Sequence, residues 1–451
     1  MQFSSYGFIF IFFPIVILTY HLIGHFMGKA VFQRLFLIAS SLFFVGYSDI
    51  KALAVMTLLA VFNYLISKHI SKPALIFALV FDLSVLAFFK YFSSFFPLGI
   101  SFYTFLQIEY LYYVYKGGKE RFDLPGFLNY ITFFPRVSAG PLTDPEKEGT
   151  SFFDGKCKNL DTQALARGLY IFSIGLFKKT VISDSLALFA DNFYSLEKFG
   201  FMVAWAGIIS YSLQLYFDFS GYSDMALGLA GMLGYKLPFN FDSPYLAKGM
   251  RDFWRRWHIS LSSLLGRLVY IPLGGSRRGS GRTYLNLMLV FLVSGIWHGK
   301  GLTFLVWGIF HGVFVCLDRF FESPLKKLPD VIRIAGTYVI AALLWVPFRA
   351  ESLDQSISVI KAAFNPFNMG KVTAVGALAN DGIVPFGDKI WTVYLIFYLS
   401  VSFFLVLQKK NSNQLYLEFR PDRKRLIWTV ALFTVSVIHL SRLTTFVYTN
   451  F

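Results

Sequence analysis

Long apolar runs recur from one end of the chain to the other, and they constrain its fold more than any other feature. Among them are GFIFIFFPIVILTY, LNLMLVFLVSGIW, GLTFLVWGIFHGVFVCL and WTVYLIFYLSVSFFLVL. The chain is 55% hydrophobic and only 15% charged. Because about 20 apolar helical residues cross a bilayer, these runs predict an all-α, polytopic integral membrane protein with roughly 11 to 13 transmembrane or re-entrant helices. No segment is polar enough for a separate soluble domain, so we expect a single membrane-embedded domain over residues 1–451.

The excess of basic over acidic residues is explained better by basic cytoplasmic loops of a membrane protein than by binding to nucleic acid. Lysine and arginine outnumber aspartate and glutamate by 42 to 26, which gives a formal net charge of +16. In a membrane protein such an excess gathers in cytoplasmic loops, so no nucleic-acid partner is expected. The cysteines, Cys157 and Cys316, are too few for a disulfide framework or a zinc site. The first apolar run lacks the flanks of a signal peptide and is predicted to be an uncleaved span.

Charge also predicts an orientation for the C-terminal half. Eight basic residues and one acid lie between Lys248 and Arg282, which places this segment in the cytoplasm. Residues 350–389 are charge-balanced, as an external loop would be, and the basic segment 409–425 is again cytoplasmic. The crossings that connect these loops are predicted at residues 284–298, 301–317, 331–347 and 390–408.

Two histidines lie in apolar segments on either side of a turn rich in proline, glycine and arginine. His258 belongs to MRDFWRRWHISLSSLLG and His298 to SGIWHG, and YIPLGGSRRGSGRTY lies between them. At about 1.5 Å per helical residue, the two imidazoles would lie roughly 20 and 24 Å from the turn, at similar depth. Histidines inside membrane helices usually face a polar cavity or partner. A paired site is therefore predicted, while a simple hydrogen bond to a neighbouring helix stays open for each histidine.

Of the two histidines, His298 has the predicted surroundings that are better suited to proton transfer. It is predicted to end its helix just before Gly299, where the helix dipole favours the imidazolium and burial disfavours it. Such opposed effects suit a general base that works near neutral pH. The remaining histidines are predicted to be structural, with His311 the best further candidate: His21, His25, His69, His311 and His439.

The residues from 213 to 299 resemble the membrane-bound O-acyltransferase family, in the branch that acetylates bacterial alginate, peptidoglycan and other surface glycans. The matching runs include LQLYFDFSGYSDMALGLAG, RDFWRRWHISLSSLL, YIPLGGSRRG and FLVSGIWHG, with PLGISFYTF and FFPRVSAGPL nearer the N-terminus. The resemblance covers roughly residues 1–320 in order. The chain departs from it at Gly266 to Tyr270, at Tyr113 and at Arg136, which leaves the glycan open.

The resemblance implies a multi-helix enzyme of the bacterial inner membrane, built around a buried tunnel. His298 matches the family's catalytic histidine and His258 its second site residue. The implied acyl donor is cytoplasmic acetyl-CoA, with no bound cofactor. The acetyl group would cross the membrane to a separate periplasmic acetyltransferase partner and finally to a cell-surface polysaccharide.

The chemistry of thioester acyl transfer assigns roles to further residues. This reaction needs a base for the acceptor hydroxyl, hydrogen-bond donors for the oxyanion and positively charged groups that bind the anionic carrier of the acyl group. We expect His298 to be the base, and His258 to orient it or to donate to the oxyanion. No metal is expected, because the histidines and acids lack ligand spacing. The candidate phosphate-binding residues, which could equally set topology, are Arg255, Arg256, Arg277, Arg278 and Arg282. The candidate pocket residues, for which packing or ion pairing is the alternative, are Trp254, Trp297, Asp218, Ser220, Tyr222 and Asp224.

Two other functions stay open at the level of sequence. In a transporter or flippase, buried ionisable residues such as Lys90, Arg136 and Asp218 would line a substrate path, although no internal repeat is evident. In a D-alanyltransferase of teichoic acid, a docking surface for a carrier protein would replace the arginine-rich mouth for coenzyme A.

Overall fold

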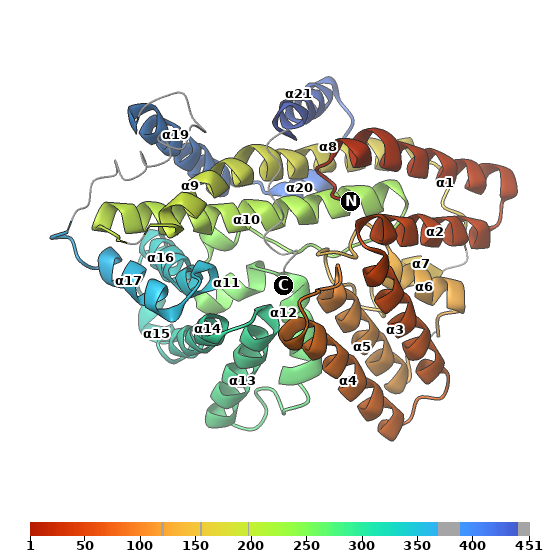
Figure 1. The fold of residues 1–451 in the computed structure, drawn as a ribbon, viewed down its shortest axis with the longest axis horizontal. Coiled ribbons are helices and arrows are strands. Elements are labelled where there is room, and N and C mark those ends of the chain that lie inside the picture. Colours follow the sequence, from red (N-terminus) through yellow and green to blue (C-terminus); the bar gives the residue numbers. More distant parts are fainter. Residues whose placement is uncertain (119–120, 154–155, 197, 369–387, 441–451) are drawn as a thin grey trace. The chain divides into compact units, whose positions relative to one another are not determined.

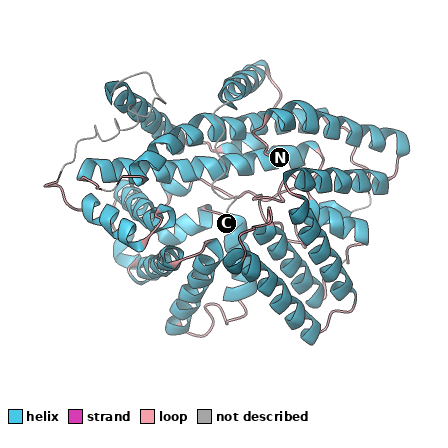
Figure 2. Ribbon diagram, in the orientation of Figure 1, coloured by secondary structure: helices cyan, strands magenta, loops and turns pink. Residues whose placement is uncertain are grey.

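The computed structural model describes residues 1–118, 121–153, 156–196, 198–368 and 388–440. These residues form helices and no strands, so the predicted all-α class is confirmed (Figures 1 and 2). They divide into two compact units that alternate along the chain. The first comprises Met1–Phe177, Ser220–Asn240 and Ser412–Phe451, and the second comprises Lys178–Phe219 and Phe241–Asn411. A single domain over the whole chain stays a prediction.

The first unit contains most of the long N-terminal helices. Its elements are η1 (Phe8–Phe12), α1 (Phe13–Met27), α2 (Ala30–Ser48), α3 (Ile50–Lys68), α4 (Lys72–Ala87), η2 (Phe88–Phe92), α5 (Ile100–Tyr115), α6 (Leu124–Thr132), α7 (Thr150–Phe153), α8 (Thr162–Phe177), α20 (Ser412–Leu417) and α21 (Arg423–His439). Local sequence sets several of these boundaries. The side chains of Asp49, Ser71 and Asp123 accept hydrogen bonds from the first turns of α3, α4 and α6.

The second unit contains both histidines of the predicted site. Its elements are η3 (Lys178–Ser183), α9 (Asp184–Tyr194), η4 (Pro244–Leu246), α11 (Met250–Arg256), α12 (Ile259–Leu265), η5 (Gly266–Tyr270), α13 (Ser280–His298), α14 (Leu302–Phe320), α15 (Glu322–Leu325), α16 (Asp330–Arg349), α17 (Leu353–Ala363) and α19 (Asp388–Val406). The long helix α10 (Phe201–Met232) contributes its first part to this unit and its second part to the other.

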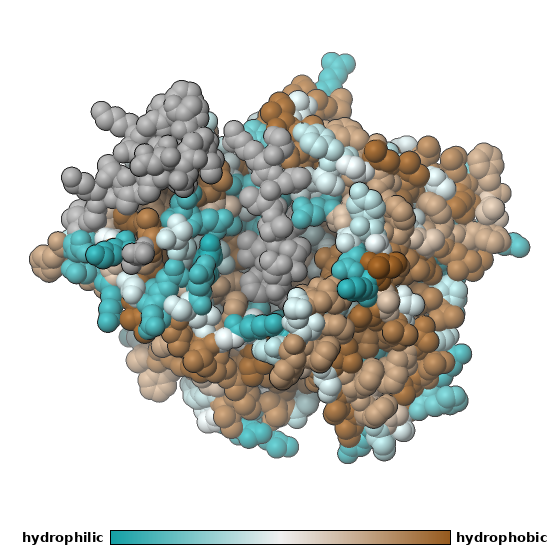
Figure 3. Space-filling model, viewed as in Figure 1, coloured by the Kyte–Doolittle hydropathy of each residue, from teal (hydrophilic) through white to brown (hydrophobic). Residues whose placement is uncertain are grey.

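Six of the described helices are long and apolar enough to cross a membrane. They are Phe8–Met27, Ala30–Ser48, Ile50–Lys68, Lys72–Phe92, Leu302–Phe320 and Asp330–Arg349. Large hydrophobic side chains are exposed along them, for example Phe26, Leu58 and Val331. In Figure 3 such residues cover the outer surface over α1 to α4, at the right of the view. Exposed apolar surface on this scale requires lipid, and the protein is a multi-pass membrane protein.

The predicted C-terminal crossings all fall on helices. Residues 284–298 lie in α13, 302–317 in α14, 331–347 in α16, and 390–406 in α19, whereas Gly301 precedes α14 and residues 407–408 of the last predicted crossing follow α19. The segment predicted to be an external loop, 350–389, contains the helix α17 over Leu353–Ala363, which Ser352 caps with its side chain. Residues 369–387 of that loop lie outside the described residues. The orientation of the crossings stays a prediction.

Arg136, which the transporter hypothesis placed on a substrate path, is a packing residue of the first unit. Its guanidinium donates to the Thr143 hydroxyl and to the Tyr130 carbonyl oxygen. It also lies 4.5 Å from the ring centroid of Tyr130 and 4.9 Å from that of Phe152. These contacts hold the buried charge in place within the fold.

Candidate active site

The close packing of α13 on α14 positions the first histidine. Two glycines face each other between these helices: a Cβ at Gly295 would lie 2.6 Å from the Phe304 carbonyl oxygen, and one at Gly308 would lie 2.5 Å from the Phe291 carbonyl oxygen. Gly308 and Gly312 form a Gly-x-x-x-Gly pair on α14. Small residues at this spacing let membrane helices approach backbone to backbone, so the end of α13 is held firmly against α14.

We expect Gly308→Ala to destabilise the protein by about 1–3 kcal/mol, because the added methyl group overpacks a filled interface. The measurement is the temperature at which the detergent-solubilised protein loses its monodisperse elution peak. Gly336→Ala on α16 is the matched control, since nothing lies within 4 Å of a Cβ there. An equal loss of stability in both variants would contradict the close packing.

The hydrogen bonds of His298 define the ring nitrogen that can act as a base. His298 is the last residue of α13 and is 2% exposed. Its Nδ1 lies 2.7 Å from the Ser294 carbonyl oxygen, which only accepts hydrogen bonds, so Nδ1 carries the hydrogen. In the neutral ring Nε2 is then the nitrogen that takes up a proton. The rings of Trp297, Trp307 and Phe348 surround the imidazole, with centroids 4.5, 4.7 and 5.5 Å away.

His258 lies at a break in the chain between two short helices. α11 ends at Arg256 and α12 begins at Ile259, and His258 has a φ of 44°, in the left-handed region. The predicted hairpin is confirmed, because α12 and η5 lead to the turn and α13 returns from it. The difference is that His258 precedes its helix instead of lying within it. The ring is 1% exposed, packs 4.7 Å from the Phe219 ring, and lies close enough to His298 for their charges to interact.

His311 joins the same cluster. It lies on α14, is 0% exposed, and interacts electrostatically with His298. Trp307 is packed between the two, with centroid distances of 4.7 Å to His298 and 4.8 Å to His311. The sequence predicts a structural role for His311, although it is the best further candidate among the remaining histidines. A stronger signal is that FHG at 310–312 repeats the His-Gly pair of WHG at 297–299.

A cavity of about 330 Å³ opens beside these histidines. Ser294 and Trp254 are in its wall: Ser294 bonds His298, and the indole N–H of Trp254 donates to Nδ1 of His311 at 3.2 Å. The rest of the wall is mostly apolar, with the hydroxyl groups of Ser262 and Tyr270 and three arginines, Arg251, Arg255 and Arg319. A second cavity of about 150 Å³ shares Arg251 and Arg255 with the first. The larger cavity thus combines apolar wall residues near the imidazoles with the positively charged side chains of Arg251, Arg255 and Arg319, which we call the arginine-rich mouth.

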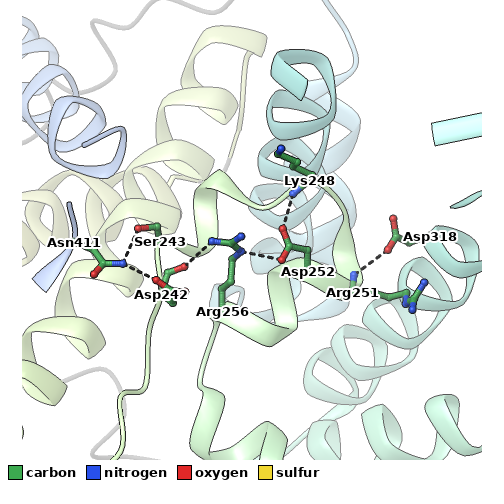
Figure 4. A network of polar contacts seen from close by, with 8 residues as sticks. All are labelled: Asp242, Ser243, Lys248, Arg251, Asp252, Arg256, Asp318 and Asn411. Carbon is green, nitrogen blue, oxygen red and sulfur yellow. Dashed lines mark hydrogen bonds and ion pairs between the residues drawn. The ribbon is translucent and has the colours of Figure 1, made fainter. Parts of the chain in front are cut away.

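The predicted phosphate-binding arginines separate into two groups. Arg255 lines both cavities. Arg256 lines neither: it pairs with Asp252 at 2.9 Å and donates to the Asp242 carbonyl oxygen at 3.3 Å, within the network of Figure 4. Arg277, Arg278 and Arg282 lie at the turn before α13 and its first residues and are not among the residues lining these two cavities.

Charges around the mouth are partly balanced by acids. Arg251 pairs with Glu322 at 2.8 Å, and Lys326 pairs with the same carboxylate at 2.8 Å. Hydrogen bonds from Lys326 and Arg251 hold the pKa of the exposed Glu322 carboxyl at about 2, so this acid stays ionised at every physiological pH. Among the described residues no acid forms a salt bridge with Arg255 or Arg319, so these two arginines provide the least compensated positive charge of the larger cavity.

The predicted pocket residues Asp218, Ser220, Tyr222 and Asp224 are not among the residues that line the two cavities. Asp218 pairs with Lys179 at 2.7 Å, and Lys179 also pairs with Asp184 at 2.8 Å, all within the second unit. Ser220, Tyr222 and Asp224 are buried but belong to the first unit, where the Tyr222 hydroxyl bonds the Ser138 hydroxyl. Trp297 packs on His298, as a wall residue would.

Comparison with known proteins identifies the chain. Residues 37–331, more than half of it, match the model of the membrane-bound O-acyltransferase family. A peptidoglycan O-acetyltransferase of Helicobacter pylori is 34% identical over 100% of this chain and 98% of its own length. A probable alginate O-acetylase AlgI of Pseudomonas putida is 34% identical over 81% of this chain and 80% of its own. A teichoic acid D-alanyltransferase of Bacillus subtilis is 26% identical over 56% of this chain and 66% of its own. The chain is therefore a multi-pass membrane O-acyltransferase and belongs to the membrane-bound O-acyltransferase family.

Proposed function

We propose that the protein transfers acetyl groups from cytoplasmic acetyl-CoA toward a hydroxyl-rich polysaccharide of the bacterial cell envelope, from the inner membrane. The observation that carries this proposal is the hydrogen bond from His298 Nδ1 to the Ser294 carbonyl oxygen. It fixes the tautomer that a general base needs, and it does so beside a cavity large enough for an acyl chain.

In the proposed reaction His298 Nε2 takes the proton of the acceptor hydroxyl as its oxygen adds to the thioester carbonyl carbon. The carbonyl oxygen gains negative charge, and then the carbon–sulfur bond breaks. The thiolate of coenzyme A leaves, and the proton held by His298 neutralises it. The enclosed aromatic surroundings of His298 limit access of water, which would otherwise hydrolyse the thioester.

Acetyl-CoA would enter with its pantetheine arm in the 330 Å³ cavity and its phosphates at Arg255 and Arg319. Guanidinium groups bind phosphate oxygens in a bidentate manner, which makes arginine suited to this task. The arginine-rich mouth also favours coenzyme A over the alternative of D-alanine transfer from a carrier protein.

The acceptor polymer is proposed from the relatives. The peptidoglycan O-acetyltransferase matches this chain over nearly its whole length, whereas the alginate relatives match about four fifths of the chain. Peptidoglycan is therefore the first candidate, and alginate-type polysaccharide the second. A periplasmic acetyltransferase that receives the acetyl group on the far side of the membrane completes the proposed pathway.

The proposal is tested by deleting the gene in its host and measuring alkali-released acetate from purified envelope polymers. We expect acetate to fall in peptidoglycan and to return when the full-length chain is supplied. Loss of ester-linked D-alanine with unchanged acetate would establish the carrier-protein alternative instead. Unchanged levels of both would refute envelope acylation by this protein.

Arg255→Gln is expected to raise the KM for acetyl-CoA about 10-fold with little change in kcat, because one bond to a charged group is lost on binding. Inverted membrane vesicles that contain the full chain are supplied with acetyl-CoA, and released thiol is measured. Arg277→Gln, at the turn, is the comparison. A larger KM increase in Arg277→Gln than in Arg255→Gln would place the phosphates at the turn, on the other arginines that the sequence predicts.

A further inference from the structure

His311 is a fully buried imidazole whose hydrogen bond fixes its chemical state. The indole N–H of Trp254 lies 3.2 Å from His311 Nδ1. An indole nitrogen only donates, so Nδ1 of His311 must accept. A neutral imidazole carries one hydrogen, which therefore resides on Nε2. A doubly protonated ring would set two N–H groups against each other, so the hydrogen bond from Trp254 selects the Nε2–H tautomer of the buried neutral ring.

The hydrogen on Nε2 of His311 has no acceptor among the described residues. The atom is buried, and no described residue lies within hydrogen-bonding geometry of it. Buried polar groups in folded proteins are hydrogen-bonded in the great majority of cases. The indole N–H groups of Trp307 and Trp345, which pack against this ring, share this state. Several donors without a described acceptor within one candidate active site indicate a partner that arrives with the substrate.

The surroundings of His311 favour such a role over simple packing. Its ring lies among Trp254, Trp307 and Trp345, with centroids 5.0, 4.8 and 5.6 Å away, and an apolar side chain would fill this cage without an orphaned donor. The charged group that acts on His311 from the neighbouring helix is His298. Trp254 connects the ring to the cavity, since it is part of the cavity wall.

We propose that His311, held as the Nε2–H tautomer by Trp254, donates a hydrogen bond from Nε2 to the thioester carbonyl oxygen as negative charge develops there. The proposal rests on the acyl transfer proposed above. His298 takes the hydroxyl proton, while His311 keeps its own proton throughout and only stabilises the oxyanion. The two imidazoles differ in the partner of Nδ1. His298 Nδ1 faces a carbonyl oxygen, which accepts a hydrogen bond, whereas His311 Nδ1 faces an indole N–H, which donates one.

The test compares His311→Leu and His311→Gln in membrane vesicles with acetyl-CoA, with thiol release measured across pH. Removal of one oxyanion donor lowers kcat by about 100-fold in comparable sites, and we expect this in His311→Leu with KM nearly unchanged. Glutamine retains an N–H donor and is expected to recover at least a tenth of the wild-type kcat. Equal kcat in the wild type and His311→Leu, at matched protein levels in the membrane, would overturn the proposal. Equally low kcat in the leucine and glutamine variants would assign His311 to packing.

Trp254→Phe isolates the hydrogen bond from the imidazole itself. Without the indole N–H, the hydrogen of the buried neutral His311 ring is no longer held on Nε2, so kcat is expected to fall at every pH. Trp307→Phe is the comparison, because Trp307 touches the same ring but no hydrogen bond joins them; its kcat is expected to fall less. An unchanged kcat in Trp254→Phe would contradict the proposal. If the wild-type protein itself releases no thiol, acetyl-CoA is not the donor and the proposed function fails first.

Discussion

His298→Ala is expected to lower acetyl transfer about 1,000-fold, the largest effect on activity of any single substitution considered. General-base catalysis contributes about 10²–10⁴ to the rate of such reactions, and no other ring in the cluster is set up to replace it. His311 has its Nδ1 committed to Trp254, and His258 lies at a separate break in the chain. The measurement is thiol release from acetyl-CoA in membrane vesicles, together with ester-linked acetate on the envelope polymers.

Two further variants make the result specific to the imidazole. Ser294→Ala removes the hydroxyl but leaves the backbone carbonyl that orients Nδ1, so we expect less than about a 10-fold loss of kcat. His25→Ala removes an exposed histidine of α1 and is expected to match the wild type. If His298→Ala retains more than a tenth of the wild-type rate at equal protein level, another group is the base. Full thiol release without acetate on the polymers would instead place His298 in a later transfer or transport step.

The sequence predicts the helices better than it predicts the contacts between them. The apolar runs locate α1, α14 and α16 because hydropathy is a local property of each segment. The end of α13 at His298 follows likewise from Gly299, although Gly299 is extended, with a φ of −172°, and not left-handed. The break at His258 is not encoded in any such pattern, because it depends on how α11 and α12 pack.

The positively charged mouth illustrates what local patterns miss. Arg251 and Arg319 are far apart in sequence, yet both line the larger cavity, because α11 packs on α14. Conversely, Arg256 is adjacent to Arg255 but faces Asp252 and Asp242, one helical position away from the cavity. Runs of basic residues predict the side of the membrane, but helix packing decides which of them meet a ligand.

Lys179→Met is expected to destabilise the protein by about 3–5 kcal/mol, the largest effect on stability of the substitutions considered. Lys179 Nζ lies 2.8 Å from Asp184 and 2.7 Å from Asp218, and the three side chains are 1%, 3% and 1% exposed. Removing the ammonium leaves two carboxylates close together in a buried site. We expect most of the protein to be lost from the membrane fraction, as measured by immunoblot and by thermal denaturation in detergent.

A neutral triple variant separates the role of the charges from that of the packing. Lys179→Met combined with Asp184→Asn and Asp218→Asn removes both uncompensated carboxylates, so it is expected to recover most of the lost stability, since replacing a whole buried ion pair is often nearly neutral. Arg349→Met, which breaks a pair with side chains 24% and 60% exposed, is the control and should cost less than about 1 kcal/mol. Asp184 and Asp218 pair with Lys179 and have no role in binding acetyl-CoA in the proposed mechanism. The triple variant is therefore also expected to keep thiol release from acetyl-CoA. A stable triple variant that releases thiol normally yet leaves the envelope without acetate would contradict this structural role and place the three residues on the path of the acyl group.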